Sequence, residues 1–209
     1  MDQQSLTKKQ NRQEDKRGLI LAAARKLMAE QGGDFTASAI AQQLGWKTPG
    51  IYYYFPNLQA IREAILLELT GESVEITRSA AHLGKDVIES VTLAFEARIH
   101  HYQAHPGDFD LLWKHYPAGG IPLEVLQEDI YPQVQSLMDE LEEMLEDGKA
   151  QGLVGLEVES RKLVNLMVCM AQGINLMYLS FKKVEGDLKF SLEEMILEGK
   201  KNLEKALKA

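Results

Sequence analysis

Residues 36–57 constrain the fold more than any other part of this 209-residue chain. They hold two short runs whose apolar residues recur three and four positions apart, which predicts two short amphipathic helices. Gly45 can take the left-handed backbone that ends the first helix. Thr48 is predicted to cap the second, with Pro49 at its first position. With a longer helix predicted for residues 16–31, they form the outline of a helix-turn-helix unit.

Three consecutive tyrosines, Tyr52, Tyr53 and Tyr54, occupy the second short helix. Ile51 and Phe55 are four positions apart and are predicted to face the core together. Because consecutive helical residues are about 100° apart, the three tyrosines cannot all be buried, although core packing under the helix is the alternative for one of them. Their hydroxyls can bind phosphate oxygens and their rings can contact thymine methyl groups. We therefore predict that at least two of them contact DNA.

Three stretches of this region carry a family resemblance: LILAAARKLMAEQG, FTASAIAQQLGW and TPGIYYYFPN. They resemble the N-terminal DNA-binding domain of the TetR family of bacterial transcriptional regulators. The resemblance implies an all-α protein, with an N-terminal three-helix helix-turn-helix domain and a larger helical C-terminal domain for ligand binding and dimerisation. Within that architecture we expect four parts: a flexible polar tail, the DNA-binding domain, a connecting helix, and the ligand-binding and dimerisation domain. Their predicted boundaries are 1–15, 16–56, 57–83 and 84–209.

The function implied by the resemblance is that of a ligand-responsive DNA-binding regulator. Such a protein is most often a repressor that a small molecule releases from a near-palindromic operator. A homodimer would set its two recognition helices about one helical turn of DNA apart. The sequence leaves open the operator, the regulated genes, the identity of the ligand and the sign of regulation.

The resemblance also carries DNA-contacting roles to ten positions in the helix-turn-helix region. These are Thr36, Ser38, Lys47, Thr48, Pro49, Gly50, Tyr52, Tyr53, Tyr54 and Asn57. The chain departs from the family pattern at Trp46, where a small aliphatic residue is usual, and at Leu58, where a phosphate-gripping lysine is common. Basic residues of the first segment can compensate as an arm, although a merely solvated tail is the alternative. They are Lys8, Lys9, Arg12, Lys16 and Arg17.

Charge is distributed unevenly along the chain. The net charge is −8, yet residues 1–67 hold nine Lys and Arg against six Asp and Glu, a balance of +3 that leaves −11 to the rest. This predicts a small basic head on an acidic body. No apolar run is expected to reach the length of a membrane span, and the polar first residues do not resemble a secretory signal. With the single Cys169, these features predict a cytoplasmic protein without a membrane partner.

From residue 84 onward the pattern predicts helix after helix, interrupted by Gly and Pro, without a strand pattern. Residues 157–181 are apolar around most of the helix circumference, so this helix needs partners on more than one side. We predict a two-fold dimer interface that includes Val164, Val168 and Gln172, joined by the last helix at about 191–207. A central core helix of a monomer is the alternative.

Large, adaptable apolar residues in this half are candidates for lining an effector site. They are Phe95, Ile99, Tyr102, Trp113, Tyr116, Met138, Met167, Met170, Ile174 and Tyr178. The methionines favour an apolar or aromatic ligand, because thioether side chains adapt to irregular space. Simple core packing is the alternative for each member of the set.

Other functional classes have weaker support. The His100, His101, His105 and His115 group lacks a Cys or close carboxylate cluster, so we expect neither a metal nor a cofactor. The chain contains no glycine-rich phosphate loop and no nucleophile elbow, so we do not expect an enzyme. A helical adaptor that binds only protein, through the acidic residues 139–147, is the main alternative to a DNA-binding regulator.

Overall fold

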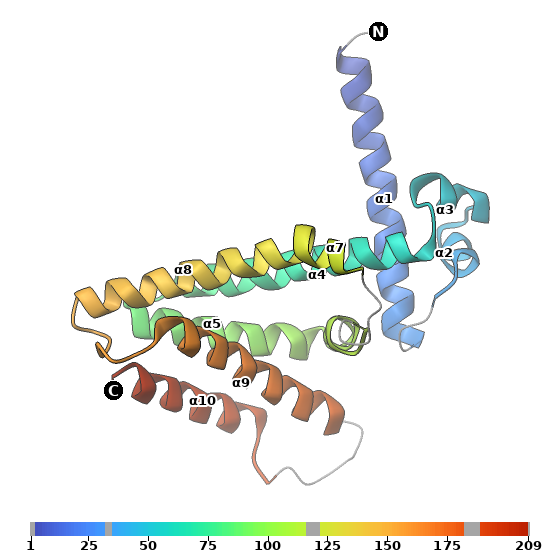
Figure 1. Ribbon diagram of the computed structural model, residues 1–209. Coiled ribbons are helices and arrows are strands. Elements are labelled where there is room, and N and C mark those ends of the chain that lie inside the picture. The colour runs from blue at the N-terminus through green and yellow to red at the C-terminus, as the bar shows by residue number, and fades with distance from the viewer. Residues whose placement is uncertain (1–2, 32–34, 116–121, 182–188, 209) are drawn as a thin grey trace. The chain divides into compact units, whose positions relative to one another are not determined.

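The computed structural model describes residues 3–31, 35–115, 122–181 and 189–208. All regular secondary structure in these residues is helical, which confirms the predicted all-α class (Figure 1). The chain divides into two compact units. The N-terminal unit comprises Met1–Leu69 and Gly107–Val125, and the C-terminal unit comprises Thr70–Pro106 and Leu126–Ala209.

The N-terminal unit begins with a long helix followed by short ones. Its helices are α1 (Gln3–Gln31), α2 (Ala37–Leu44), α3 (Thr48–Tyr54) and the first half of α4 (Leu58–Ala81). α1 therefore extends through most of the segment that we expected as a polar tail. The physical reason is composition, because residues 3–17 contain neither Gly nor Pro and are rich in Gln, Lys and Arg, which favour helix.

A small apolar core holds these helices together. It includes the fully buried Ile20, Ala24, Ile40, Ile51, Phe55, Ile61 and Ile65. Each of the four helices contributes at least one of these side chains, at spacings of three or four positions where a helix contributes two. The core of this unit is therefore assembled from few residues, and its outer surfaces remain available for other partners.

Residues 107–125 also belong to the N-terminal unit, which differs from the continuous domain of residues 84–209 that we expected. They include most of α6 (Pro106–Asp110), the π-helical turn η1 (Leu111–His115) and α7 (Leu123–Val125). The Arg25 guanidinium donates to both carboxylate oxygens of the buried Asp108, at 3.0 and 2.6 Å. A Cβ atom on Gly107 would lie 2.9 Å from the Cβ of Ala29. This ion pair and close backbone approach join α6 to α1.

The C-terminal unit consists of longer helices around one apolar core. They are α5 (Val87–Ala104), the π-helical turn η2 (Leu126–Ile130), α8 (Tyr131–Ala150), α9 (Ser160–Phe181) and α10 (Leu192–Leu207), with the second half of α4. α9 packs against α5, α8 and α10 (Figure 1). A Cβ atom on Gly199 of α10 would lie 2.5 Å from Cζ of Phe95, so α10 and α5 meet without space for a larger residue there.

By length and composition alone, Ser160–Ser180 of α9 could cross a membrane, with a mean hydropathy of 1.4. Our expectation that no apolar run approaches that length was therefore wrong. A core helix of a soluble protein passes the same test, and α9 packs against three other helices of its unit. The length of this helix is thus weak evidence for a membrane span.

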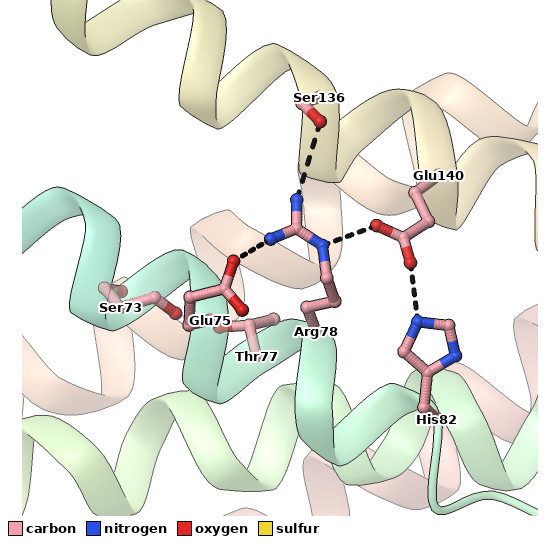
Figure 2. A network of polar contacts seen from close by, with 7 residues as sticks. All are labelled: Ser73, Glu75, Thr77, Arg78, His82, Ser136 and Glu140. Carbon is pink, nitrogen blue, oxygen red and sulfur yellow. Dashed lines mark hydrogen bonds and ion pairs between the residues drawn. The ribbon is translucent and has the colours of Figure 1, made fainter.

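Polar side chains join α4 to α8 within the same unit (Figure 2). Arg78 Nε donates to Glu140 at 2.7 Å, Glu75 also pairs with the Arg78 guanidinium, and His82 Nε2 lies 2.7 Å from the other Glu140 oxygen. The hydrogen bond to Glu140 raises the pKa of Arg78 above its ordinary value despite partial burial. Burial opposes ionisation of Glu140, but the bonds from Arg78 and His82 outweigh it and lower the pKa of Glu140. Glu140 is therefore a charged link between two helices.

Candidate nucleic-acid interface

Local chemistry determines both ends of α2. The Thr36 hydroxyl oxygen accepts a hydrogen bond from the backbone N–H of Ala39 at 3.1 Å, which caps the helix as predicted. Gly45 ends the helix in the left-handed region, at φ 68° and ψ 27°. The N–H of Trp46 then donates to the Ala41 carbonyl at 2.8 Å and completes a tight turn toward α3. A residue with a Cβ would be strained at position 45.

The start of α3 differs from our prediction. Lys47 is the N-cap residue, without a side-chain capping bond, and Thr48 is already the first helical residue. Pro49 therefore occupies the second helical position and not the first. It is tolerated there because the first four N–H groups of a helix have no partner within the helix. The Thr48 side chain thus has no part in capping α3.

The faces of α3 are separated as predicted. Ile51 and Phe55 are buried, whereas Tyr52 and Tyr53 are exposed to 49% and 69%. Tyr54 is half-buried and packs edge-on against Tyr53, with ring centres 5.0 Å apart. Two of the three tyrosines therefore leave their rings and hydroxyl groups on the surface.

The remaining candidates from sequence lie around α3 on the same unit. Thr36, Ser38, Lys47, Pro49 and Asn57 are exposed, while Thr48 and Gly50 are half-buried. The side-chain amide oxygen of Asn57 accepts a hydrogen bond from the backbone N–H of Ala60 at 2.8 Å and so caps α4 as predicted. Its amide N–H donors are not used in that bond, and they are chemically suited to a phosphate oxygen.

The two departures from the family pattern have different surroundings. Trp46 is half-buried with its ring centre 6.2 Å from that of Tyr54, and the Nζ atom of Lys16 lies 5.8 Å from the Trp46 ring centre. Leu58 is half-buried at the first position of α4. Of the predicted basic arm, the structure describes the side chains of Lys16 and Arg17, and those of Lys8, Lys9 and Arg12 lie outside its described side chains.

Comparison with known proteins identifies this arrangement. Residues 20–65 match the family described as bacterial regulatory proteins, tetR family. Residues 20–65 therefore carry the N-terminal domain of that family. This region has the DNA-binding helix-turn-helix of a bacterial regulatory protein. None of the curated proteins compared with the chain matches.

Solved structures share the fold over nearly the whole chain. The fatty acid degradation regulator FadR from Bacillus halodurans is 21% identical with a TM-score of 0.69, covering 90% of this chain and 94% of its own. FadR from Bacillus subtilis, solved in complex with stearoyl-CoA, is 18% identical with a TM-score of 0.70, covering 90% and 97%. A TetR family transcription regulator from Marinobacter aquaeolei VT8 is 18% identical with a TM-score of 0.68, covering 95% and 98%. At these identities the likeness shows the fold of this TetR-family protein.

The candidate effector residues of this TetR-family protein do not all lie in one unit. Phe95, Ile99, Tyr102, Met138, Met167 and Ile174 are buried in the C-terminal unit, where Met170 and Tyr178 pack around the core. Trp113 instead belongs to the N-terminal unit, beside Phe109 with ring centres 6.2 Å apart. Tyr116 lies outside the described residues. Trp113 departs from the set because its segment belongs to the same unit as α1, where Asp108 pairs with Arg25.

The predicted dimer residues need one correction. Val164 is only 1% exposed and faces the core of its own unit, so it cannot contact another chain. Val168 and Gln172 are half-buried at the edge of that face. The residues that α9 exposes instead form a stripe at intervals of three and four: Lys162, Asn165, Leu166, Cys169, Gly173, Leu176 and Ser180. The helical spacing was the available signal, but a helix apolar all round does not reveal which face is covered.

The histidines whose side chains the structure describes form no recognisable metal site. The rings of His101 and His105 lie 5.3 Å apart at their centres, and His100 lies 3.7 Å from a Glu96 carboxylate oxygen. The His115 side chain lies outside the described ones. Among the side chains that are described, no three His, Cys, Asp or Glu groups come together for a metal ion.

Proposed function

We propose that this TetR-family chain acts as a homodimeric, ligand-responsive repressor that binds a near-palindromic operator through α3. The observation that carries the proposal is the exposure of Tyr52 and Tyr53 on a helix whose opposite face, Ile51 and Phe55, is buried. Large aromatic side chains are normally covered, so two that remain exposed beside Lys47 favour a partner that uses both rings and hydroxyl groups. Duplex DNA presents such a partner in its major groove.

Six of the ten candidate residues divide by chemistry into two groups. Thr36, Ser38 and Asn57 carry short polar side chains suited to phosphate oxygens, which position the protein without reading sequence. Tyr52 and Tyr53 carry rings that can reach thymine methyl groups in the groove, and Lys47 can donate to guanine. Half-buried Tyr54 is suited to supporting Tyr53 by edge-to-face packing.

The exposed stripe of α9 supports the homodimer. Leu166 and Leu176 are exposed to 57% and 56%, and no charged residue occurs between positions 163 and 180. Such a surface is suited to a second copy of the same helix across a two-fold axis. Leu197 of α10 is a further exposed leucine of this unit, at 54%. In this proposal Val168 and Gln172 remain interface residues, and Leu166 and Leu176 replace Val164.

The effector site is proposed within the C-terminal unit, among Phe95, Ile99, Met138, Met167, Met170, Ile174 and Tyr178. One related fold, FadR from Bacillus subtilis, was solved with stearoyl-CoA. An apolar ligand with a long chain agrees with side chains of this kind, because methionine and aliphatic residues adapt to a flexible chain. We therefore extend the predicted class of apolar or aromatic effectors to acyl compounds.

The route from effector to DNA is proposed to run through residues 105–115. α5 ends at His105 and leads directly into α6, which the Arg25–Asp108 ion pair joins to α1. An effector that favours a different position of α5 would thus act on α1 through a bidentate link. The effector must bind the DNA-incompetent state more tightly, since equal affinity for both states shifts nothing.

We further propose that this regulator has no catalytic activity of its own. It would act in the cytoplasm, without a membrane partner. The family identification supports the absence of an enzyme activity only at the level of the family. An adaptor that binds only protein should have no salt-dependent affinity for duplex DNA. The affinity of a DNA-binding regulator should depend strongly on the salt concentration. This difference separates the two functions.

The test begins with selection of binding sites from random duplex DNA by the purified protein. Fluorescence anisotropy on the winning sequence then compares wild type with Tyr52→Ala and Lys47→Ala, and with Tyr131→Ala as a matched control for an exposed tyrosine of the C-terminal unit. We expect a near-palindromic winner, a loss of about 1 to 3 kcal/mol for Tyr52→Ala and Lys47→Ala, and no change for the control. Stearoyl-CoA, free CoA and stearate are then titrated onto the complex to identify release.

The absence of an enriched sequence would contradict the DNA-binding proposal. Equal weakening by Tyr131→Ala would also contradict the assignment of α3 as the reading helix. If the protein binds DNA but none of the three titrants releases it, the DNA-binding function is supported and acyl compounds are excluded as its effector class.

A further inference from the structure

The DNA-reading surface carries little positive charge for its proposed partner. Of the ten residues predicted to contact DNA, Lys47 alone is charged. Phosphate neutralisation supplies much of the affinity of DNA-binding proteins, and it requires Lys or Arg beside the backbone. Further cations near α3 are therefore needed for ordinary affinity.

A recess of about 380 Å³ lies beside α3 within the N-terminal unit. Its lining combines two lysines with three aromatic side chains and one glycine: Lys16, Trp46, Lys47, Gly50, Tyr53 and Tyr54. This lining contains no carboxylate, so the recess has a positive character suited to an anion. Part of the surface predicted to read DNA, including Lys47 and Tyr53, lines the same recess.

Within this recess, Trp46 holds the Lys16 side chain. The Nζ atom of Lys16 lies 5.8 Å from the Trp46 ring centre, at the distance of a cation–π contact. The ring is itself half-buried and packs 6.2 Å from Tyr54, so it is a fixed platform. The contact with the ring face needs no hydrogen-bond acceptor, so the three N–H donors of the ammonium group stay available for phosphate oxygens.

The neighbouring Arg17 joins α1 to the end of α3. Its Nη1 donates to the Tyr54 carbonyl at 2.6 Å, and its guanidinium carbon lies 4.0 Å from the Phe55 ring centre. A cation is favourable at this position, because the carbonyls at a helix C-terminus carry partial negative charge. Since Lys16 and Arg17 are adjacent, this contact keeps the Lys16 backbone beside Trp46.

We propose that Lys16, held against Trp46, binds a phosphate of the DNA backbone beside the groove that α3 reads. The inference rests on the proposed DNA-binding function and adds a contact from α1 to it. A phosphate contact positions the protein without reading sequence. Lys16 therefore sets affinity and salt dependence, while α3 sets the preferred sequence.

The test measures anisotropy on the selected duplex over a series of salt concentrations. Lys16→Gln should lower the slope of log affinity against log salt by about one per DNA-binding head, and weaken all duplexes alike. Trp46→Leu should produce a similar loss, and the double variant should lose no more than Lys16→Gln alone. Lys26→Gln is the matched control, because Lys26 is an exposed lysine of the same helix that lies 3.9 Å from Glu30. It should leave the slope unchanged.

Lys16 is exposed, so its replacement does not threaten folding, and circular dichroism would verify the Trp46→Leu variant. An unchanged slope for Lys16→Gln with intact wild-type binding would overturn this inference while the DNA-binding function stands. A changed sequence preference would also overturn it, because that would indicate a base contact. Failure of wild type to bind any duplex would instead remove the proposed function.

Discussion

The two units both leave large apolar side chains exposed, but the chemistry of these surfaces differs. In the N-terminal unit they include the aromatic Tyr52 and Tyr53, with hydroxyl groups and a lysine at the start of the same helix. In the C-terminal unit they include the aliphatic Leu166 and Leu176, on a helix without charge from residue 163 to 180. Exposure alone therefore indicates a partner but does not identify it. Rings with polar tips beside cations suit a polyanion, whereas exposed leucines on a helix without charge between residues 163 and 180 suit another protein surface.

The units also differ in how they use polar groups. In the N-terminal unit many polar side chains are helix caps or lie exposed around α3, such as Thr36 and Asn57. In the C-terminal unit some are buried or partly buried between helices: the Tyr102 hydroxyl and Arg98 both donate to the Ser73 hydroxyl oxygen, at 2.9 and 3.1 Å. Polar contacts between helices thus stabilise the C-terminal unit, as the Arg25–Asp108 pair does in the N-terminal unit, where further polar groups around α3 stay exposed.

The largest effect on stability is expected from a cavity in the small apolar core of the N-terminal unit. Phe55→Ala removes a fully buried ring and should cost about 3 to 5 kcal/mol of unfolding free energy. Tyr53→Ala, from the exposed face of the same helix, should cost at most about 0.5 kcal/mol. Urea unfolding followed by circular dichroism measures both. Similar losses for the two variants would show that the faces of α3 are not separated as described.

The next effect concerns the stripe of α9. Leu166→Glu combined with Leu176→Glu should weaken a homodimer by about 100-fold or more, since each protomer loses two apolar contacts and acquires like charges across the axis. The helical content of the chain should not change, because both leucines are exposed. Sedimentation velocity at several concentrations measures the dimer. Leu156→Glu, which replaces another exposed leucine of the same unit, is the control, and dimers that survive the double change would exclude this stripe as the interface.

Acidification should weaken the C-terminal unit through Glu140. Its pKa is lowered in the folded protein, so its contribution to stability is present above the ordinary carboxyl pKa and is lost as the pH falls through the lowered value. Glu140→Gln should cost about 1 kcal/mol at neutral pH, because the link to Arg78 is partly exposed. Unfolding measured between neutral and acidic pH should show a smaller pH dependence for the variant. An identical pH dependence would mean that the Glu140 link contributes nothing to folding.

The smallest effect should come from Gly173, which lies in the exposed α9 stripe. A Cβ atom there meets nothing within 4 Å in the chain itself, and alanine favours a helix over glycine by about 0.5 to 1 kcal/mol. Gly173→Ala should therefore raise the unfolding free energy of the monomeric Leu166→Glu/Leu176→Glu background by that amount. In the wild-type background, weaker dimerisation would indicate that the two helices cross close to Gly173. Unchanged dimerisation would place the crossing elsewhere along the stripe.

Sequence patterns predicted the local structure of the head well, because the signals are local. Thr36 and Asn57 cap the helices that they were expected to cap, and Gly45 ends α2 in the left-handed region. The start of α3 was harder, since a proline at either of the first two helical positions satisfies the same constraint. The polar segment before residue 16 was missed as helix because an apolar stripe was taken as the sign of one.

In the C-terminal unit the same methods found the helices but not the covered face of α9. A helix apolar on most sides, such as α9, does not show from its sequence that Val164 points to the core and Leu166 to the surface. Residues 107–125 follow α5 and were assigned to the C-terminal domain, yet they belong to the N-terminal unit. The Arg25–Asp108 contact within that unit joins residues 83 positions apart, and no local pattern predicts such a contact.

The sequence by itself determined the helical class, the helix-turn-helix and the family, since caps, glycine turns and three-and-four spacing act within a few residues. Only the tertiary structure decided which face of α9 is covered, which segment belongs to which unit, and that Lys16 lies over Trp46. Those features come from contacts between residues distant in the chain. Helical periodicity describes the positions of residues along one helix and contains no information about which other helix packs against that helix.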